Sequence, residues 1–400
     1  MQRLKLNSAG ACAFALAMLM TACSDSGSPS ESTYQADVRR TSFGYPHIKA
    51  NNEKGLGYGV GYAFAQDNFC LLAEDVATVE GARSKYFGVT STYDPDGSGT
   101  SVANLPSDFF YKIMNEAPLV DATWQRQSEE VKDLVRGYAA GVNRYLRDTG
   151  SANLPAACKG AAWVRPINEL DLMRMMRRFA LAGSGTQFVE AFYAAQPPAT
   201  ATTNSAERAR PAQIQSVSGY TPAAPGYWRR LLRTDHASRG SNGVALGREA
   251  TESGAGLLLG NPHFPWTSPY RFYQLHLTIP GKVDVLGASL GGFPVVNIGH
   301  NGNVAWTHTN NTSAHFTLFH LTLDPANVAR YLIDGQSKAL NAREFTVDSG
   351  AGGLLRRTYY FSEHGPLLAI PGLLDWTRSA AFAFGDANLD NDRLFAQWGL

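Results

Sequence analysis

The 400-residue chain lacks a strong excess of charge of either sign. Lys and Arg total 35 and Asp and Glu total 34, so the formal net charge is only +1. Binding to nucleic acid requires a basic surface, and no basic patch interleaved with aromatic residues makes up for the low net charge. The hydrophobic fraction of 44% against 17% charged residues excludes the disordered class. The composition therefore predicts a packed globular protein with no nucleic-acid partner, and the length favours two or more folding units.

The chain also lacks a hydrophobic run long enough to span a bilayer. Its one apolar run, Ala11–Met20, is short, follows two basic residues and precedes Cys23. This order is typical of a bacterial export signal, and the small residues before Cys23 resemble a lipobox. We predict that residues 1–23 are this signal, that residues 24–37 are a polar tether, and that the protein is periplasmic. It would be an outer-membrane lipoprotein if Cys23 is lipidated, and the alternative is ordinary secretory cleavage nearby.

Cysteine and metal-ligand patterns are scarce. Beyond the export signal only Cys70 and Cys158 remain, and the sequence leaves open whether they pair or stay as free thiols. Asp94–Gly99 matches the opening of a calcium-binding EF-hand loop, but the twelfth position is Leu105 where the motif requires Glu. The histidines show no zinc-ligand spacing. The local motifs thus predict no metal and no other cofactor.

The character of the chain changes twice along its length. Apolar residues at three- and four-residue steps predict a helix over residues 119–147 and a second over 168–181, with Asn168 as N-cap. A stretch rich in Ala, Pro, Thr, Ser and Gln then predicts a linker over residues 196–240. Beyond it, alternating patterns predict strands, two of them joined by a tight hairpin at Asn301-Gly302. The predicted strands are 256–259, 272–279, 283–286, 295–300, 303–309 and 316–323.

Two serines compete as nucleophile. Ser289 lies in a G-x-S-x-G pattern, which needs a following helix to present the hydroxyl, but the next residues predict a turn and a strand. We therefore interpret Ser289 as a turn residue. Ser241 lies in a Gly-Ser-Asn-Gly stretch that is by itself an ordinary turn, yet it stands where the linker ends and the strands begin. A serine at a newly made N-terminus carries its own base, because the α-amine has an ordinary pKa of about 7.7–8.0.

Five blocks of the chain stand together with these residues: 43–48 (FGYPHI), 61–68 (GYAFAQDN), 240–242 (GSN), 260–266 (GNPHFPW) and 304–311 (VAWTHTNN). In order along the chain, these blocks resemble those of the penicillin acylase family of N-terminal-nucleophile hydrolases. The similarity runs in order from about residue 38 to the end. The pair His263–Phe264 is similar to the branch that holds acyl-homoserine-lactone and aculeacin-type acylases, whereas penicillin G enzymes have glutamine at the position of His263.

The resemblance implies an α+β fold, the four-layer αββα sandwich, and a precursor that cleaves itself between Gly240 and Ser241. Residues 38–195 would form the small (α) subunit region, 196–240 an excised spacer, and 241–400 the first part of the large (β) subunit of a heterodimer. Ser241 would be the nucleophile and its α-amine the base. The backbone N–H of Asn310 and the side chain of His263 would face the developing oxyanion. Phe264 would line the acyl pocket, and Met176 and Phe179 are proposed for the same pocket from their location alone.

Departures from the family pattern set limits on this interpretation. A further oxyanion asparagine is expected beyond Leu400, so we expect the chain to be a truncated precursor. The positions at which some relatives bind calcium are Ser313 and Phe316 here, which does not support that site. The sequence favours an amide hydrolase acting on N-acyl compounds such as acyl-homoserine lactones, with penicillin or cyclic-lipopeptide acylase as the alternative. A non-catalytic surface lipoprotein that serves as a binding module is the alternative from another class.

Overall fold

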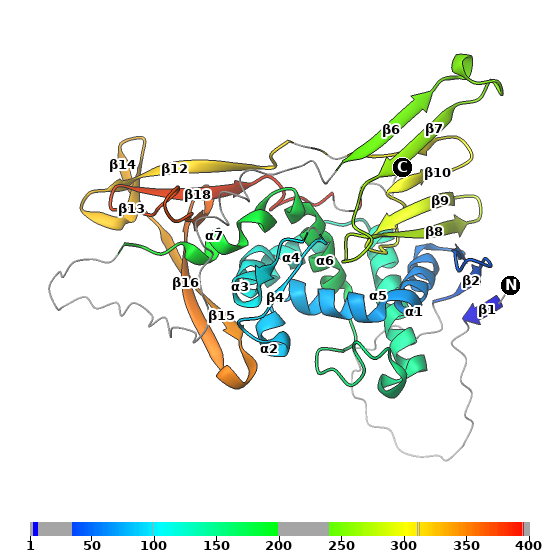
Figure 1. Cartoon of the computed structure of the whole chain (residues 1–400), viewed down its shortest axis with the longest axis horizontal. Helices are drawn as coiled ribbons and strands as arrows, with labels where there is room; N and C mark the ends of the chain where they lie inside the picture. Colours follow the sequence, from blue (N-terminus) through cyan, green and yellow to red (C-terminus); the bar gives the residue numbers. More distant parts are fainter. Residues whose placement is uncertain are drawn as a thin grey trace, which may run out of the picture.

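The computed structural model describes residues 3–6, 34–97, 99–198, 240–309, 311, 313–393 and 395. Cys23, Asn310 and residues 199–239, which make up most of the predicted spacer, lie outside this set. A central group of helices is flanked by two large sheets, and a two-stranded ribbon projects away from one of them (Figure 1). Within the described residues no helix is long and apolar enough to cross a membrane. The helices are α1 (Glu53–Val79), α2 (Arg83–Phe87), α3 (Asn104–Met114), α4 (Ala117–Gln125), α5 (Glu129–Thr149), α6 (Glu169–Ala182) and α7 (Val189–Ala194).

The two longest helices, α1 and α5, pack against each other through glycine. A Cβ added at Gly57 of α1 would overlap the carbonyl oxygen of Leu134, and one added at Gly141 of α5 would overlap the carbonyl oxygen of Tyr58. The two backbones therefore approach more closely than side chains would allow. Sequence patterns did not predict α1 as a helix, because four glycines in its first nine residues give it low intrinsic helix propensity.

The predicted helix over residues 119–147 is wrong as a single element. The structure breaks it into α4 and α5, with Ser128 between them as an N-cap whose hydroxyl accepts a hydrogen bond from the N–H of Val131 at 3.3 Å. Glu129 and Glu130 follow in the first turn, where carboxylates favour the start of a new helix. The second prediction is confirmed, since Asn168 caps α6 in a reciprocal capping box with Asp171.

The first sheet combines strands from both halves of the chain. Its order is β1-β2-β3-β8-β9-β10-β11, and β3 pairs in parallel with β8, with Ile48 opposite Leu277. The alternation predicted for residues 272–279 is confirmed, since Leu275 and Leu277 are fully buried. The strands are β1 (Arg3–Leu6), β2 (Ala36–Arg40), β3 (Pro46–Lys49), β8 (Phe272–Ile279), β9 (Val283–Leu290), β10 (Ile298–His300) and β11 (Ala305–Trp306).

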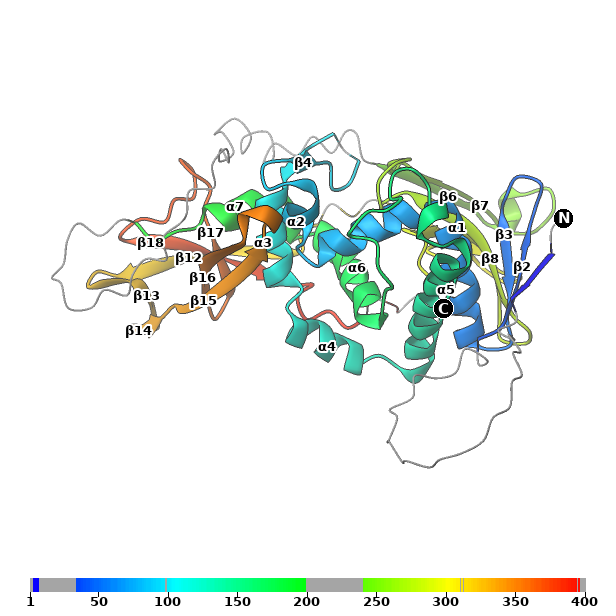
Figure 2. The same cartoon turned by 90° about the horizontal axis from the view of Figure 1, so that it is seen from below.

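The second sheet lies on the other side of the helices (Figure 2). Its order is β14-β13-β12-β18-β17-β16-β15, and α3 and α7 contact it. Phe188, Phe192, Phe316 and Phe384 form an aromatic cluster between the helices and this sheet, with ring centroids 5.0–5.5 Å apart. The strands are β12 (Phe316–Asp324), β13 (Asn327–Ile333), β14 (Gln336–Ala339), β15 (Asn341–Asp348), β16 (Leu354–Ser362), β17 (Gly365–Leu368) and β18 (Ala380–Asp386); β4 (Thr92–Tyr93) and β5 (Val102–Ala103) form a separate pair.

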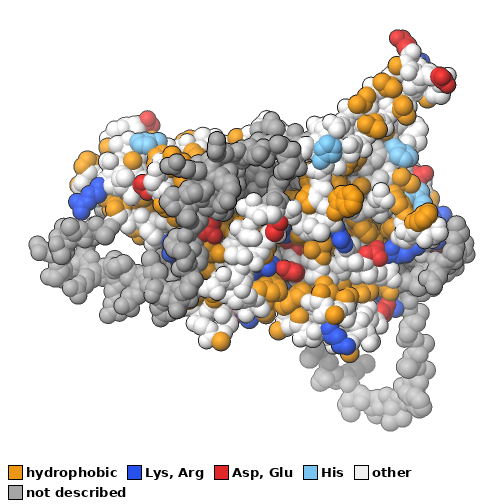
Figure 3. Space-filling model, in the orientation of Figure 1, with side chains coloured by type: hydrophobic (Ala, Val, Ile, Leu, Met, Phe, Trp, Pro, Cys, Tyr) orange, Lys and Arg blue, Asp and Glu red, His pale blue; other side chains and the backbone are white. Residues whose placement is uncertain are grey.

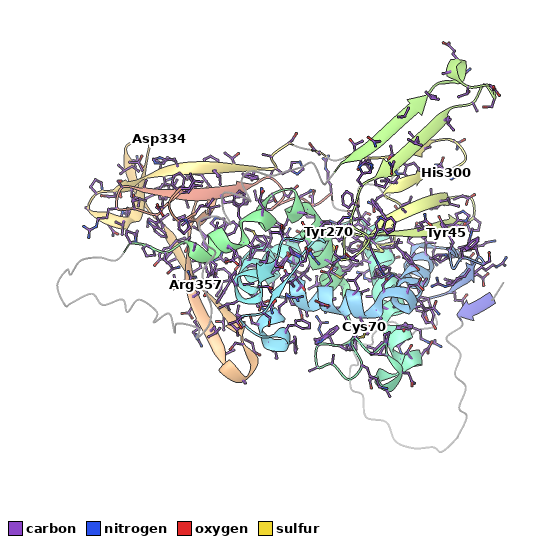
Figure 4. The ribbon with its side chains drawn as sticks, in the orientation of Figure 1. Tyr45, Cys70, Tyr270, His300, Asp334 and Arg357 are labelled. Carbon is purple, nitrogen blue, oxygen red and sulfur yellow. A yellow bond between two sulfur atoms is a disulfide. The ribbon has the colours of Figure 1, made fainter. Side chains whose placement is uncertain are left out.

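The structure settles two points that the sequence left open. Cys70 and Cys158 form a disulfide that closes a loop across 88 positions of the helical region (Figure 4). The predicted hairpin at Asn301-Gly302 joins β10 to β11, but through a four-residue loop in which the Asn301 side chain accepts hydrogen bonds from the N–H groups of Asn303 and Val304.

Candidate active site around Ser241

Ser241 begins β6 (Ser241–Leu246), one strand of the projecting ribbon. It pairs with Pro262 of β7 (Leu257–Pro262), and the register continues to Leu246 opposite Leu257. The ribbon extends beyond the first sheet, and its surface carries hydrophobic side chains (Figure 3). Val244, Leu246, Leu257 and Leu259 are 39–60% exposed. An apolar patch of this kind is typical of an interaction surface, and Ser241 lies at the inner end of the ribbon.

A pair of glycines brings another segment of chain against this inner end. Gly243 and Gly260 lie opposite each other in the ribbon, and Thr307 packs over both of them. A Cβ at Gly260 would lie 2.8 Å from the Thr307 hydroxyl oxygen, and one at Gly243 would lie 3.1 Å from its methyl carbon. The segment that leads to position 310 therefore crosses the ribbon close to Ser241, where only glycine leaves room for it.

The hydroxyl of Ser241 lies against the peptide bond that it is predicted to attack. It donates a hydrogen bond to the carbonyl oxygen of Gly240 at 2.6 Å. The backbone N–H of His263 donates to the same carbonyl oxygen at 3.0 Å and lies 3.4 Å from the Ser241 hydroxyl oxygen. The His263 N–H thus polarises the Gly240 carbonyl, as a developing oxyanion would require, and the Ser241 hydroxyl lies against the same carbonyl group.

The imidazole of His263 is held by two asparagine side chains. The amide nitrogens of Asn261 and Asn242 lie 3.1 and 3.3 Å from its Nε2 atom. These asparagines are directly opposite each other in the ribbon, and His263 follows Asn261 by two residues, so all three side chains lie on one face. The Nδ1 atom is turned towards Gly240, since a Cβ added there would lie 3.5 Å from it. Sequence reasoning missed both asparagines and the glycine pair, although their cross-strand spacing follows once the register is known.

The described residues predicted for the acyl pocket have different packing partners. Asn310 is outside the described residues. Phe264 packs its ring on Phe272, with centroids 5.5 Å apart. Phe179 packs on Tyr270, which Figure 4 places between the helices and the first sheet, with centroids 4.9 Å apart. Met176 is buried in the core. A common acyl pocket for these residues stays a prediction.

A cavity of about 280 Å³ lies beside the loop that follows Phe264, lined on one side by Thr267, Ser268 and Pro269. Its other walls carry the ion pairs Arg178–Asp75 and Arg83–Glu74. An acyl chain requires an apolar lining, so this charged cavity does not suit one.

The competing serine is part of the sheet. Ser289 lies within β9 and is fully buried, and its hydroxyl donates to the carbonyl oxygen of Phe293 at 2.7 Å. The interpretation of Ser289 as a turn residue is wrong, because β9 continues to Leu290, four residues beyond the predicted strand end at 286. A buried hydroxyl that is bonded to the backbone cannot meet a substrate.

The loop at Asp94 uses its carboxylate for its own backbone. Oδ1 accepts hydrogen bonds from the N–H groups of Asp96 and Gly97, and Oδ2 accepts one from Gly99. Burial raises the pKa of Asp94, but these hydrogen bonds outweigh burial and hold it below its usual value. Phe316, at one of the positions compared with a calcium site, packs in the aromatic cluster of the second sheet. Across the part of the chain that the structure describes, no three acidic, histidine or cysteine residues gather in a way that would hold a metal.

The structure mixes helices and sheets, and it places Ser241 at the start of a strand directly after Gly240. Residues 35–399 match the family described as Penicillin amidase. The chain belongs to the penicillin amidase family.

Relatives within this family align in sequence with nearly the whole of this chain. The acyl-homoserine lactone acylase PvdQ of Pseudomonas fluorescens (strain Pf0-1) is 48% identical over 375 residues, which are 93% of this chain and 46% of that protein. Aculeacin-A acylase of Actinoplanes utahensis is 40% identical over 375 residues, with the same coverage of both chains. A solved penicillin G acylase of Alcaligenes faecalis aligns over 37% of this chain and 25% of its own, with 21% identity and a TM-score of 0.31, which is too low to support an argument about the fold. The chain thus spans about half the length of the relatives it matches in sequence.

Proposed function

We propose that this chain is part of a self-processing amidohydrolase that cleaves the acyl–amide bond of N-acyl compounds, with N-acyl-homoserine lactones as the substrate class. The observation that carries the proposal is the short hydrogen bond from the Ser241 hydroxyl to the Gly240 carbonyl oxygen, which also accepts from His263. The identity of 48% to an acyl-homoserine lactone acylase supports the substrate class. The family membership supports the four-layer αββα fold as part of the proposal. In the described residues the helices lie between the two large sheets (Figure 1), which is not the layer order of that fold.

In the first reaction the precursor cuts itself. The Ser241 oxygen attacks the carbonyl carbon of Gly240, and the negative charge that develops on the carbonyl oxygen is stabilised by the N–H of His263. The hydroxyl proton passes to the Ser241 nitrogen as the C–N bond breaks, which leaves an ester between Gly240 and the Ser241 oxygen. Water then hydrolyses the ester, so that Gly240 gains a carboxylate and Ser241 gains a free α-amine and its hydroxyl.

In the second reaction the free serine hydrolyses the substrate. The α-amine takes the hydroxyl proton while the oxygen attacks the acyl carbon, and the proton then passes to the leaving amine as the amide bond breaks. Water releases the acid from the acyl–enzyme ester. In this step the N–H of Asn310 and the side chain of His263 would stabilise the oxyanion.

Contacts across the cut support a stable heterodimer of the two products. Residues 34–198 and residues from 241 onward share the first sheet through the β3–β8 pairing. Tyr45 donates hydrogen bonds to the carbonyl oxygens of both Leu275 and Gly287 at 3.0 and 3.1 Å. Tyr273 donates to Asp67 at 2.6 Å. None of these contacts involves Gly240 or Ser241, so cleavage of the bond between them breaks none of the contacts.

Cleavage itself tests the proposal. Intact-mass measurement of the purified product should find a chain that begins at Ser241, and the Ser241→Ala variant should stay uncut. Cleavage of that variant at the same bond would show that Ser241 is not the nucleophile. A panel of N-acyl-homoserine lactones, a cyclic lipopeptide and penicillins would then separate the substrate classes, with aculeacin-type acylase as the alternative that the 40% identity supports.

A second candidate function is a non-catalytic binding module, for which the exposed apolar ribbon is the favouring observation. Failure of the purified protein to cleave itself or any member of the panel would favour this function. Export to the periplasm with an anchor at Cys23 is also proposed. Fractionation of cells that express the Cys23→Ala variant tests it, since the variant should leave the membrane fraction.

A further inference from the structure

We infer that Asn242 and Asn261 are positioning residues that hold the His263 ring with its proton on Nδ1, facing the bond that is cut. This inference rests on the proposed function, because it assigns how His263 serves the Ser241 nucleophile. It concerns the two side chains that contact His263 Nε2, at 3.1 Å from Asn261 and 3.3 Å from Asn242.

The chemistry of the two contacts decides which nitrogen carries the proton. An amide NH₂ group is only a donor, so an Nε2 atom that faces two of them must offer its lone pair. A neutral imidazole has one protonated nitrogen, and the proton therefore lies on Nδ1. A carboxylate at either position would have the opposite effect, since it accepts a hydrogen bond and favours a proton on Nε2. The two amides thus select one tautomer of the neutral ring.

The position of Nδ1 determines what the protonated nitrogen of His263 faces. The side of the ring that carries Nδ1 faces Gly240, where a Cβ would stand 3.5 Å away in ordinary contact. The Nδ1–H group therefore lies beside the scissile residue, next to the backbone N–H that already bonds the Gly240 carbonyl oxygen at 3.0 Å. Once residue 240 has left, the same donor faces the space at Ser241 in which the acyl group of a substrate would lie.

Geometry explains why the two asparagines act together. They form one cross-strand pair on the face of the ribbon that also carries His263. Both residues are exposed, as is His263, so among the described residues no buried packing holds the ring in place. The hydrogen bonds to Nε2 are the contacts that orient the imidazole, and the rigid antiparallel register between β6 and β7 fixes the distance between the two amides.

The test replaces one amide by a carboxylate of the same shape. Asn261→Asp should move the proton of His263 to Nε2, and self-cleavage should slow by about 10²-fold, the usual loss when one oxyanion donor is removed. Asn242→Asp should act in the same direction and serves as a second, independent variant. The matched control is Asn341→Asp, which makes the same change of charge at the exposed start of β15; it should cleave at the unaltered rate.

The tautomer is measured directly by ¹⁵N NMR of histidine-labelled precursor in a Ser241→Ala background, in which the chain is expected to stay uncut. Protonated Nδ1 in the parent and protonated Nε2 in the Asn261→Asp variant are the expected results. Protonated Nε2 in the parent would overturn the inference, as would Asn261→Asp and Asn242→Asp variants that cleave as fast as the Asn341→Asp control. If the unaltered protein cleaves, Ser241→Ala does not, and both aspartate variants are normal, only the positioning role fails. Cleavage of Ser241→Ala would overturn the proposed function itself.

Discussion

The contact between Gly260 and Thr307 makes a graded steric prediction. In Gly260→Ala the new Cβ would lie 2.8 Å from the Thr307 hydroxyl oxygen and 3.0 Å from its Cβ, closer than unstrained atoms approach. The opposite residue, Gly243, has its nearest neighbour at 3.1 Å, and Gly247, directly after β6, has open space around it. Alanine at these three positions therefore forms a series in which only the steric overlap changes.

The magnitude follows from the cost of overpacking. An extra methyl group in a filled space costs about 1–3 kcal/mol, which corresponds to roughly 5- to 150-fold in an equilibrium constant. We expect Gly260→Ala to reach this range, because both Thr307 atoms belong to the rigid start of the side chain, and Gly243→Ala to cost less. Gly247→Ala should be neutral or slightly stabilising, since alanine lowers the entropy of the unfolded chain.

The overlap should separate residues 305–309 from the ribbon and so disturb the neighbouring segment that carries Asn310. The assay is the rate at which the fragment that begins at Ser241 appears, measured beside the free energy of unfolding for each variant. The expected order of loss is Gly260→Ala, then Gly243→Ala, with Gly247→Ala unchanged. Equal rates for all three variants would refute the packing of Thr307 over the glycine pair.

Three further predictions concern stability and the excluded nucleophile. Replacing Cys70 and Cys158 by serine should lower the free energy of unfolding by about 4–5 kcal/mol in the chain-entropy account, because the disulfide spans 88 positions. Burial raises the pKa of Asp108 to about 6 from 3.8, although hydrogen bonds from Ser84 oppose it. Since the folded state keeps this proton longer, stability should fall by up to about 3 kcal/mol as the pH rises from about 4 to about 6. Ser289→Ala should cost about 1 kcal/mol through the lost bond to the backbone and leave hydrolysis unchanged.

Each of these has a direct check. Urea unfolding of the double serine variant, compared with the oxidised parent, measures how much the disulfide contributes to the free energy of unfolding. Equal unfolding midpoints for the two proteins would contradict the predicted loss. Urea unfolding across the same pH range, with Asp108→Asn as the control, should show that the variant lacks the parent's loss of stability. An unchanged slope in that variant would assign the effect to other groups. A Ser289→Ala variant that folds but fails to hydrolyse an N-acyl substrate would make Ser289 a candidate nucleophile again.

Part of the fold was predictable because its signals are local. The alternation of Leu275 and Leu277 marks one buried face of a strand, and Asn168 marks a helix start by its own side chain. The break between α4 and α5 was missed although Ser128 and two glutamates signal it, because the apolar period continues on either side. The helix α1 was missed for another reason: glycine lowers helix propensity, and the packing against α5 that compensates for it is tertiary.

The sequence by itself determined the choice between the two serines, the family, and the role expected of Ser241, because these depend on residue type and order along the chain. Only the tertiary structure decided what surrounds that serine. Pairing of β6 with β7 places Asn242, Asn261 and His263 on one face and sets the His263 N–H against the Gly240 carbonyl oxygen. The packing of Thr307 over two glycines brings a segment more than 60 residues away in sequence to the same place. Register and close packing join residues that are distant in sequence, and no local pattern encodes them.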